Sequence, residues 1–171
     1  MKKLLFTSLL AIICFFTNAQ DDKSKMPSPP ASVIGKIGDA SLTIKYHQPA
    51  VKGRAVWDAT SSLAPNGKVW RTGANNATTF EIDQDIKVEG KTLAKGKYAL
   101  FSIPGEKEWV IIFNSKAAQW GAYSYKEAED VLRVTVPAGK SESFNERFVI
   151  AQNGNTINLS WENVKVGFNV E

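Results

Sequence analysis

Hydrophobic and polar residues alternate in short segments along most of this 171-residue chain, a pattern typical of β-strands with one buried face. The alternation is clearest over residues 41–46 and 131–136. Residues 109–113 are instead continuously apolar, which predicts a strand that is covered on both faces. The other strand segments that the pattern predicts are 80–82, 86–88, a short run that ends at Leu93, 98–103, 148–150, 156–161 and 164–170.

Turn-forming residues separate these segments and leave little room for helix. Glu89-Gly90 predicts a tight hairpin turn, and Pro104-Gly105 ends the segment before residues 109–113. Ser124 and Glu127 have the spacing of a capping box, which supports one short helical turn, with a plain loop as the alternative. We therefore predict an all-β fold: a single antiparallel β-sandwich, jelly-roll-like or barrel-like, with roughly nine to ten short strands and at most one short helical turn.

Residues 1–19 have the features of a secretory signal peptide. Lys2 and Lys3 give a positive start, residues 4–16 are almost entirely apolar, and small residues precede a predicted cleavage site between Ala19 and Gln20. A single-spanning anchor is the alternative, but the apolar run is short for a bilayer-spanning helix. We therefore expect an exported protein, periplasmic or secreted, with no transmembrane segment in the mature chain.

Cys14 is the only cysteine and lies within the predicted signal peptide. It could be lipidated, but a lipoprotein signal needs a small residue where Ile13 stands, so we favour simple cleavage. The mature chain would then contain no cysteine, which excludes disulfides and a thiol nucleophile.

Removal of residues 1–19 leaves a nearly balanced chain. Because it takes away two lysines and no acid, the formal net charge falls from +4 to +2. The basic precursor is therefore weak evidence for a nucleic-acid partner, and we predict none. Residues 20–31 are charged and then proline-rich, and we interpret them as a flexible leader. Residues 32–171 are long enough for a single β domain with a sizeable core, whose oligomeric state the sequence leaves open.

The residue inventory excludes several kinds of site. There is one histidine, His47, so a multi-histidine metal centre is excluded, and the scattered acids form no calcium-binding loop. Gly90-Lys91-Thr92 and Gly139-Lys140-Ser141 both lack the upstream glycine of a phosphate-binding loop. We therefore predict no metal and no cofactor.

Residues 67–80 combine an indole, a guanidinium, two carboxamides and three threonines with two glycines. An indole beside hydrogen-bonding groups is typical of a sugar platform, and an arginine fork binds carboxylate or phosphate. Arg54, in the irregular segment that precedes this run, and a second aromatic group around Trp120 add to the set. The candidate ligand-binding residues are Arg54, Trp70, Arg71, Asn75, Asn76 and Trp120.

The alternative is that these residues are architecture. Trp70 would then lie in the core, and Arg71 would pair with a buried acid such as Glu81. Trp120 and Tyr125 would cap the core under a loop instead of lining a cleft. The residues alone leave both interpretations open.

Several of these segments resemble one family, the exported bacterial proteins called domain of unknown function 2911. The similar parts are Tyr46 with residues 49–54, and the segments 67–75, 97–105, 108–114 and 119–123. The resemblance covers nearly the whole mature chain, and the run from Trp70 to Asn75 is specific to it. It implies export and a β-rich domain, but no assigned activity, cofactor or catalytic residue. The family tends towards serine or arginine where His47-Gln48 stands before the proline, which weakens a catalytic role for His47.

Three functions are compatible with the sequence. The one we favour is an exported domain that binds a small polar ligand, a saccharide or an organic anion, at the tryptophan, arginine and asparagine cluster. The second is an envelope-associated hydrolase, for which the candidate groups are His47, Asp58, Glu81 and the arginines. The third is a non-catalytic structural or interaction protein of the cell envelope.

Overall fold

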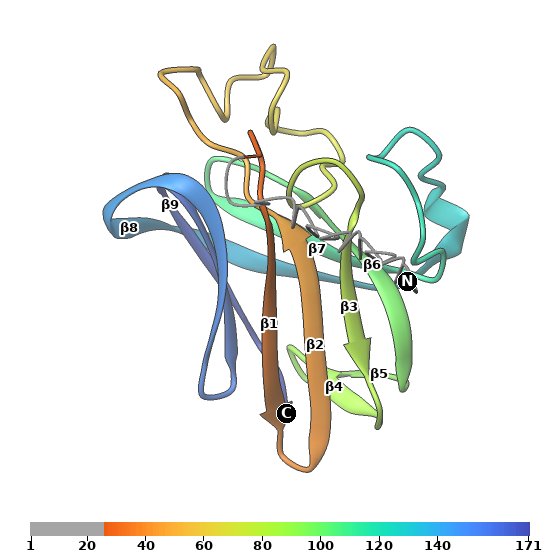
Figure 1. The fold of residues 1–171 in the computed structure, drawn as a ribbon. Helices are drawn as coiled ribbons and strands as arrows, with labels where there is room; N and C mark the ends of the chain where they lie inside the picture. The colour runs from red at the N-terminus through yellow and green to blue at the C-terminus, as the bar shows by residue number, and fades with distance from the viewer. Residues whose placement is uncertain (1–25) are drawn as a thin grey trace, which may run out of the picture.

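The computed structural model describes residues 26–171, so the predicted signal peptide lies outside the described residues. Nine β-strands and one 3-10 turn make up the regular structure of this part of the chain (Figure 1), which confirms the prediction of an all-β fold with at most one short helical turn. The elements are β1 (Pro30–Ile37), β2 (Ala40–His47), β3 (Thr78–Ile82), β4 (Ile86–Val88), β5 (Lys91–Leu93), β6 (Gly96–Ile103), β7 (Glu108–Asn114), the turn η2 (Glu127–Glu129), β8 (Asp130–Asn153) and β9 (Thr156–Asn169). Within residues 26–171, no helix is long and apolar enough to cross a membrane.

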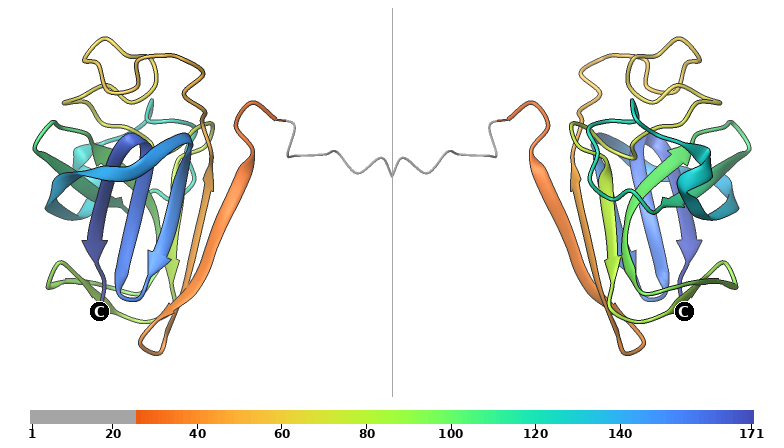
Figure 2. Two further views of the ribbon diagram at one scale, coloured as in Figure 1. Left: turned by 90° about the vertical axis from the view of Figure 1, so that its left-hand side faces the viewer. Right: turned by 90° about the vertical axis from the view of Figure 1, so that its right-hand side faces the viewer.

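Seven strands form one antiparallel sheet in the order β1-β2-β3-β6-β7-β8-β9, and β4 and β5 form a separate hairpin. The large sheet curls on itself into a half-barrel, as the side views in Figure 2 show. The β4-β5 hairpin is attached to the end of β9 because Val88 forms an antiparallel bridge with Val170. Its turn is the predicted one: Glu89 and Gly90 have φ of 46° and 75°, the left-handed values that a two-residue hairpin turn needs.

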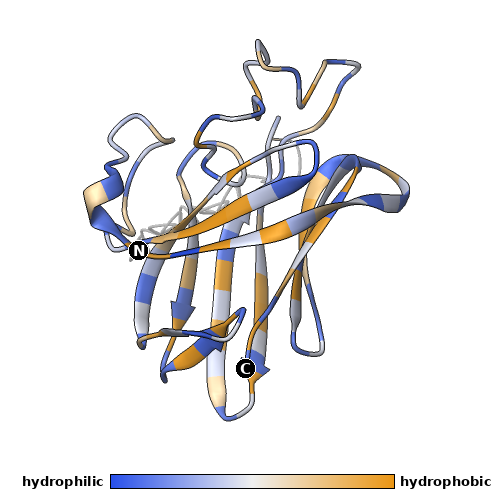
Figure 3. Ribbon diagram, turned by 180° about the vertical axis from the view of Figure 1, so that it is seen from behind, coloured by the Kyte–Doolittle hydropathy of each residue, from blue (hydrophilic) through white to orange (hydrophobic). Residues whose placement is uncertain are grey.

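The central strands are buried on both faces. On the concave face, β7 contributes Trp109, Ile111 and Phe113 to the main core. On the convex face lies a smaller cluster of Ala77, Ala99, Phe101 and Ile112, against which Val69, Ala122 and Tyr125 pack from two loops. The prediction that residues 109–113 form a strand covered on both faces is therefore confirmed. Elsewhere apolar and polar residues alternate along the strands, as the colours of Figure 3 show.

β1 is a strand that the hydrophobic pattern does not single out. Its polar face carries Ile34, which is 80% exposed, while its inner face carries the small residues Ala31 and Gly35. This weakens the contrast between the two faces on which period-two recognition depends.

β8 and β9 each join two of the predicted short segments into one long strand. The pairing of β8 with β9 shifts register between Lys140 and Asn145 and again between Asn145 and Val149. On the opposite strand, Glu162 has a φ of 54°. Such bulges bend a strand without ending it, and they turn the outer half of this hairpin across the open side of the half-barrel.

The outer half of β8 meets β1 and β2 along a boundary that we call the seam. One isolated antiparallel bridge joins Ala50 to Arg147 there, and side chains provide further links. The Tyr46 hydroxyl accepts a hydrogen bond from the backbone N–H of Ile150 at 3.1 Å and donates one to its carbonyl at 3.4 Å. Gln152 Nε2 donates to Lys36 O at 2.6 Å. Along the seam, side chains thus provide hydrogen-bond partners for backbone groups of β8 and β1 that a neighbouring strand would otherwise pair.

Replacing Tyr46 with phenylalanine should destabilise the protein, because the buried polar groups of Ile150 lose their partner. We expect the free energy of unfolding, measured by urea titration, to fall by about 1–3 kcal/mol. Tyr123→Phe is the matched control, since this side chain is 84% exposed and should change stability by less than about 0.5 kcal/mol. Equal effects of the two substitutions would show that the Tyr46 hydroxyl does not hold the seam.

Candidate functional site

Residues 67–78 form a loop that is tied to the end of β6 by buried polar groups. The backbone of Trp70 exchanges two hydrogen bonds with Ser102, at 2.7 and 2.9 Å. The hydroxyls of Thr72 and Ser102 are 2.9 Å apart, and Thr78 Oγ1 donates to Thr72 O at 2.6 Å. All three hydroxyl side chains are fully buried. Thr72 and Thr78 therefore bond Ser102 and the backbone, and they hold the loop in place.

Gly73 lies close to the backbone of β2. A Cβ atom at this position would lie 3.0 Å from both the carbonyl oxygen of His47 and the hydroxyl of Thr78. Its own carbonyl accepts hydrogen bonds from Trp70 Nε1 at 3.1 Å and from Arg71 Nε at 3.4 Å. A glycine is thus needed for the close contact with His47 and Thr78. Its carbonyl orients the side chains of Trp70 and Arg71.

Trp70 lies in the core, with 3% of its surface exposed. It stacks on Trp161, with ring centroids 5.7 Å apart and an interplanar angle of 14°, and it meets Trp57 and Trp109 edge to face. The indole is therefore a structural member of an aromatic core, one of the two interpretations that the sequence leaves open. Arg71 does not pair with Glu81, whose carboxylate lies 3.1 Å from Lys97 Nζ.

The structure does not bring Arg54 and Arg71 into one site. The Arg54 guanidinium donates to the carbonyls of its own loop, Val51 O at 3.1 Å and Ala50 O at 2.6 Å. Arg71 lines a small hollow of about 240 Å³ together with Tyr123.

Asn75, Asn76 and Trp120 do come together. Asn76 and Trp120 form an antiparallel bridge, and the N–H of Gly121 donates to Asn75 O at 3.0 Å. Backbone hydrogen bonds therefore join the loop that carries Trp120 to the loop that carries the two asparagines. The Trp120 residue remains 61% exposed.

A polar clip fixes the segment that carries Trp120 onto β7 and β8. The Tyr125 hydroxyl donates to Asp130 Oδ2 at 2.6 Å and accepts from Arg133 Nη2 at 2.7 Å. Asn114 Nδ2 donates to the other oxygen of Asp130 at 2.8 Å. Burial, followed by the bond to Asp130, raises the pKa of Tyr125 to about 12, so the hydroxyl keeps its proton at any physiological pH. The predicted capping box does not form, because Ser124 bonds Gln119 instead and η2 begins after Lys126.

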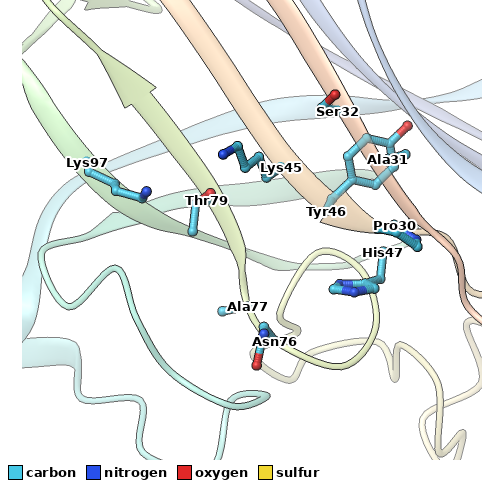
Figure 4. Close-up of a pocket in the computed structure, with 10 residues that line it drawn as sticks. All are labelled: Pro30, Ala31, Ser32, Lys45, Tyr46, His47, Asn76, Ala77, Thr79 and Lys97. Carbon is cyan, nitrogen blue, oxygen red and sulfur yellow. The ribbon is translucent and has the colours of Figure 1, made fainter. Parts of the chain in front are cut away.

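A groove, which we call the convex groove, lies on the outer face of β1, β2, β3 and β6. One hollow of about 500 Å³ is lined by residues that include Lys45, His47, Asn76, Thr79 and Lys97 (Figure 4). An adjoining hollow of about 600 Å³ shares Asn76, Ala77, Thr79 and Lys97 with the first and extends to Trp120. The two hollows thus adjoin along these four residues, beside the loop-covered part of the convex face, and together they make up the convex groove.

The floor of the convex groove carries positive charge and hydroxyl groups. In Figure 4 the ammonium ends of Lys45 and Lys97 lie on either side of Thr79. Cross-strand pairing produces this arrangement. Lys45 of β2 is opposite Thr79, and Lys97 of β6 is opposite Glu81, which lies two residues from Thr79 on the same face of β3. Burial lowers the pKa of His47, so its imidazole is neutral at pH 7. The groove therefore combines ammonium groups with neutral hydrogen-bonding groups.

Two of the candidate groups for a hydrolase, Asp58 and Glu81, have partners in the described part of the chain. Asp58 accepts hydrogen bonds from Thr60, and Glu81 is paired with Lys97. Among residues 26–171, no group of three histidine, cysteine or acidic residues is placed to hold a metal ion.

Sequence reasoning missed Lys45, Thr79 and Lys97 as groove residues. Each occupies an ordinary polar position on a strand, and Lys97 is one of four lysines, at positions 87, 91, 95 and 97, whose pattern is typical of strand-edge protection. Only the register of β2, β3 and β6 brings them together, and that register cannot be read from local pattern.

The fold and the groove define a class: a β domain of one large curled sheet and a small hairpin, with an open convex groove beside a loop-covered cluster. The chain belongs to the family described as Protein of unknown function (DUF2911), which matches residues 28–170. No curated protein and no solved structure matches the chain.

Stability should depend on pH through His47, the only histidine. Because burial lowers its pKa in the folded state, the unfolded chain takes up the proton first as the pH falls. We expect the free energy of unfolding to decrease as the pH falls through about 6.5, the pKa of an exposed histidine. His47→Gln should flatten the profile between about pH 7 and about pH 5.5 in urea titrations. An unchanged slope in the variant would contradict this assignment.

Proposed function

We propose that this protein binds a small polar ligand, a saccharide or an organic anion, in the convex groove. The observation that carries the proposal is the exposed indole of Trp120 at one end of a hollow whose floor presents Thr79 and Lys97. A binding site for a polar ring needs a flat apolar surface and convergent hydrogen-bonding groups, and this combination supplies both.

The groups in the groove have complementary tasks. Asn76 offers a carboxamide and Thr79 a hydroxyl, which can each donate and accept hydrogen bonds to sugar hydroxyls. Lys45 and Lys97 place ammonium groups where a carboxylate or phosphate would lie. Glu81 lies 3.1 Å from Lys97 Nζ, and this ion pair orients the lysine and offsets its positive charge. Lys45 therefore carries the larger share of the attraction for an anion.

The supporting structure is rigid where the ligand would bind. The floor consists of hydrogen-bonded strands, and the wall that carries Asn76 and Trp120 is tied down by their bridge and by the Tyr125 clip. A site held this way loses little conformational entropy when the ligand binds. The arginine and tryptophan of the motif contribute to this architecture and not to the groove floor.

Binding should depend on Trp120 and Lys45. Isothermal titration with a panel of neutral and acidic monosaccharides and small dicarboxylates should identify a ligand whose affinity falls about tenfold or more, equal to about 1.4 kcal/mol, in Trp120→Ala or Lys45→Ala. Because both side chains are exposed, the melting temperatures of the variants should stay unchanged.

Tyr123→Ala and Lys107→Ala are the matched controls, because both residues are exposed and neither lines the convex groove. They should bind as the wild type does. The proposal fails if no compound of the panel binds, or if the controls weaken binding as much as the groove variants.

We also propose that the protein acts outside the cytoplasm, on the basis of the signal-peptide features of residues 1–19. Mass spectrometry of the protein from its native host should show a mature chain that begins at Gln20. A chain that retains residues 1–19, or one that begins with a lipidated Cys14, would contradict simple cleavage.

A further inference from the structure

We infer that the ligand of the convex groove is an acidic oligosaccharide that occupies both hollows, with one sugar unit against Trp120 and an acidic group at Lys45. This inference rests on the proposed function and specifies its ligand. Its basis is the shape of the groove: two hollows of about 500 and 600 Å³ meet at Asn76, Ala77, Thr79 and Lys97. A single small molecule would fill one of them and leave the other open.

The two hollows differ in chemistry. The first reaches Ser32, Lys45 and His47, so it offers a hydroxyl, an ammonium and a neutral imidazole. The second reaches Ala117, Ala118 and Trp120, so it offers small side chains beside an exposed indole. One end therefore suits a charged, hydrogen-bonding group, and the other suits the flat face of a sugar ring.

The groove runs across the strands. The register places Ser32 opposite Lys45 and Lys45 opposite Thr79, which gives a row of polar side chains from β1 to β3. β6 follows as the next strand and contributes Lys97. Neighbouring strands lie about 4.8 Å apart, so the floor from β1 to β6 spans about 14 Å. This length suits a chain of linked rings better than one ring.

The charge of the floor selects an acidic chain over a neutral one. Lys45 and Lys97 approach Thr79 from two strands, and Glu81 offsets one of the two positive charges. An acidic group gains a favourable charge interaction with the exposed ammonium of Lys45, which a neutral chain does not. A uronic acid unit supplies a carboxylate for Lys45, and a sugar ring linked to it can lie against Trp120 at the other end of the groove.

Chain length provides the test. Galacturonic acid and its linear dimer and trimer should be titrated against the mature protein by isothermal calorimetry. Linking two units makes the second contact intramolecular, so we expect the dimer to bind at least about tenfold more tightly than the monomer. Cellobiose, a neutral dimer, should bind at least about tenfold more weakly than the acidic dimer.

Two variants assign the ends of the chain. Trp120→Ala should reduce the affinity for the acidic dimer to that for the monomer, because it removes one of the two contacts. Lys45→Ala should weaken monomer and dimer alike and reduce the dependence of binding on salt. Tyr123→Ala, outside the groove, should leave both affinities unchanged.

The outcomes separate this inference from the function on which it rests. Equal affinities for monomer, dimer and trimer would overturn it, although a monomer that binds at Trp120 or at Lys45 would still support the proposed function. Equal affinities for the acidic and neutral dimers would overturn the assignment of an acidic chain. If neither these saccharides nor any compound of the broader panel binds, both proposals fall.

Discussion

Within residues 26–171 the large sheet has no second sheet of comparable size, so it has to bury its own apolar face, and this requirement shapes the rest of the fold. Curling brings opposite strands together around an aromatic centre in which Trp70 stacks on Trp161 at 5.7 Å. Neither tryptophan lies in a regular part of the curl. Trp161 precedes the bulge at Glu162, and Trp70 belongs to a loop tied to Ser102. The curl is therefore completed by the irregular segments, which aim these rings inward.

The same curl leaves the convex face only partly covered. Loop 67–78 sends Trp70 into the main core and Val69 onto the convex cluster, so one loop stabilises both sides of the sheet. Ala122 and Tyr125 also pack on that cluster, and the nearby Trp120 is exposed. The groove is the boundary between covered and uncovered sheet. A site at such a boundary has a rigid floor and an aromatic edge as consequences of how the core is closed.

Hydrophobic pattern predicted the fold class and the doubly covered strand at residues 109–113, because both depend on local alternation. It missed β1, where Ile34 faces outward, and it divided β8, whose bulges resemble strand ends. Of the six candidate site residues, Asn76 and Trp120 line the groove, while Trp70 lies in the core. An indole suits either location, and sequence cannot decide between them. The lysines of the floor depend on the pairing of distant strands, which no local pattern encodes.

Tyr46 and its neighbours on β2 connect the seam to the groove. Successive strand residues point to opposite faces, so Tyr46 reaches inward to Ile150 while Lys45 and His47 face the groove. The Ile150 amide is protected by a hydroxyl and not by a neighbouring strand. Its hydrogen exchange therefore reports the parting of two barrel edges, whereas amides of the central strands report unfolding of the whole domain. A molecule bound on the outer face of β2 that stiffens this strand is therefore expected to slow that local opening, because the groove and the seam share β2.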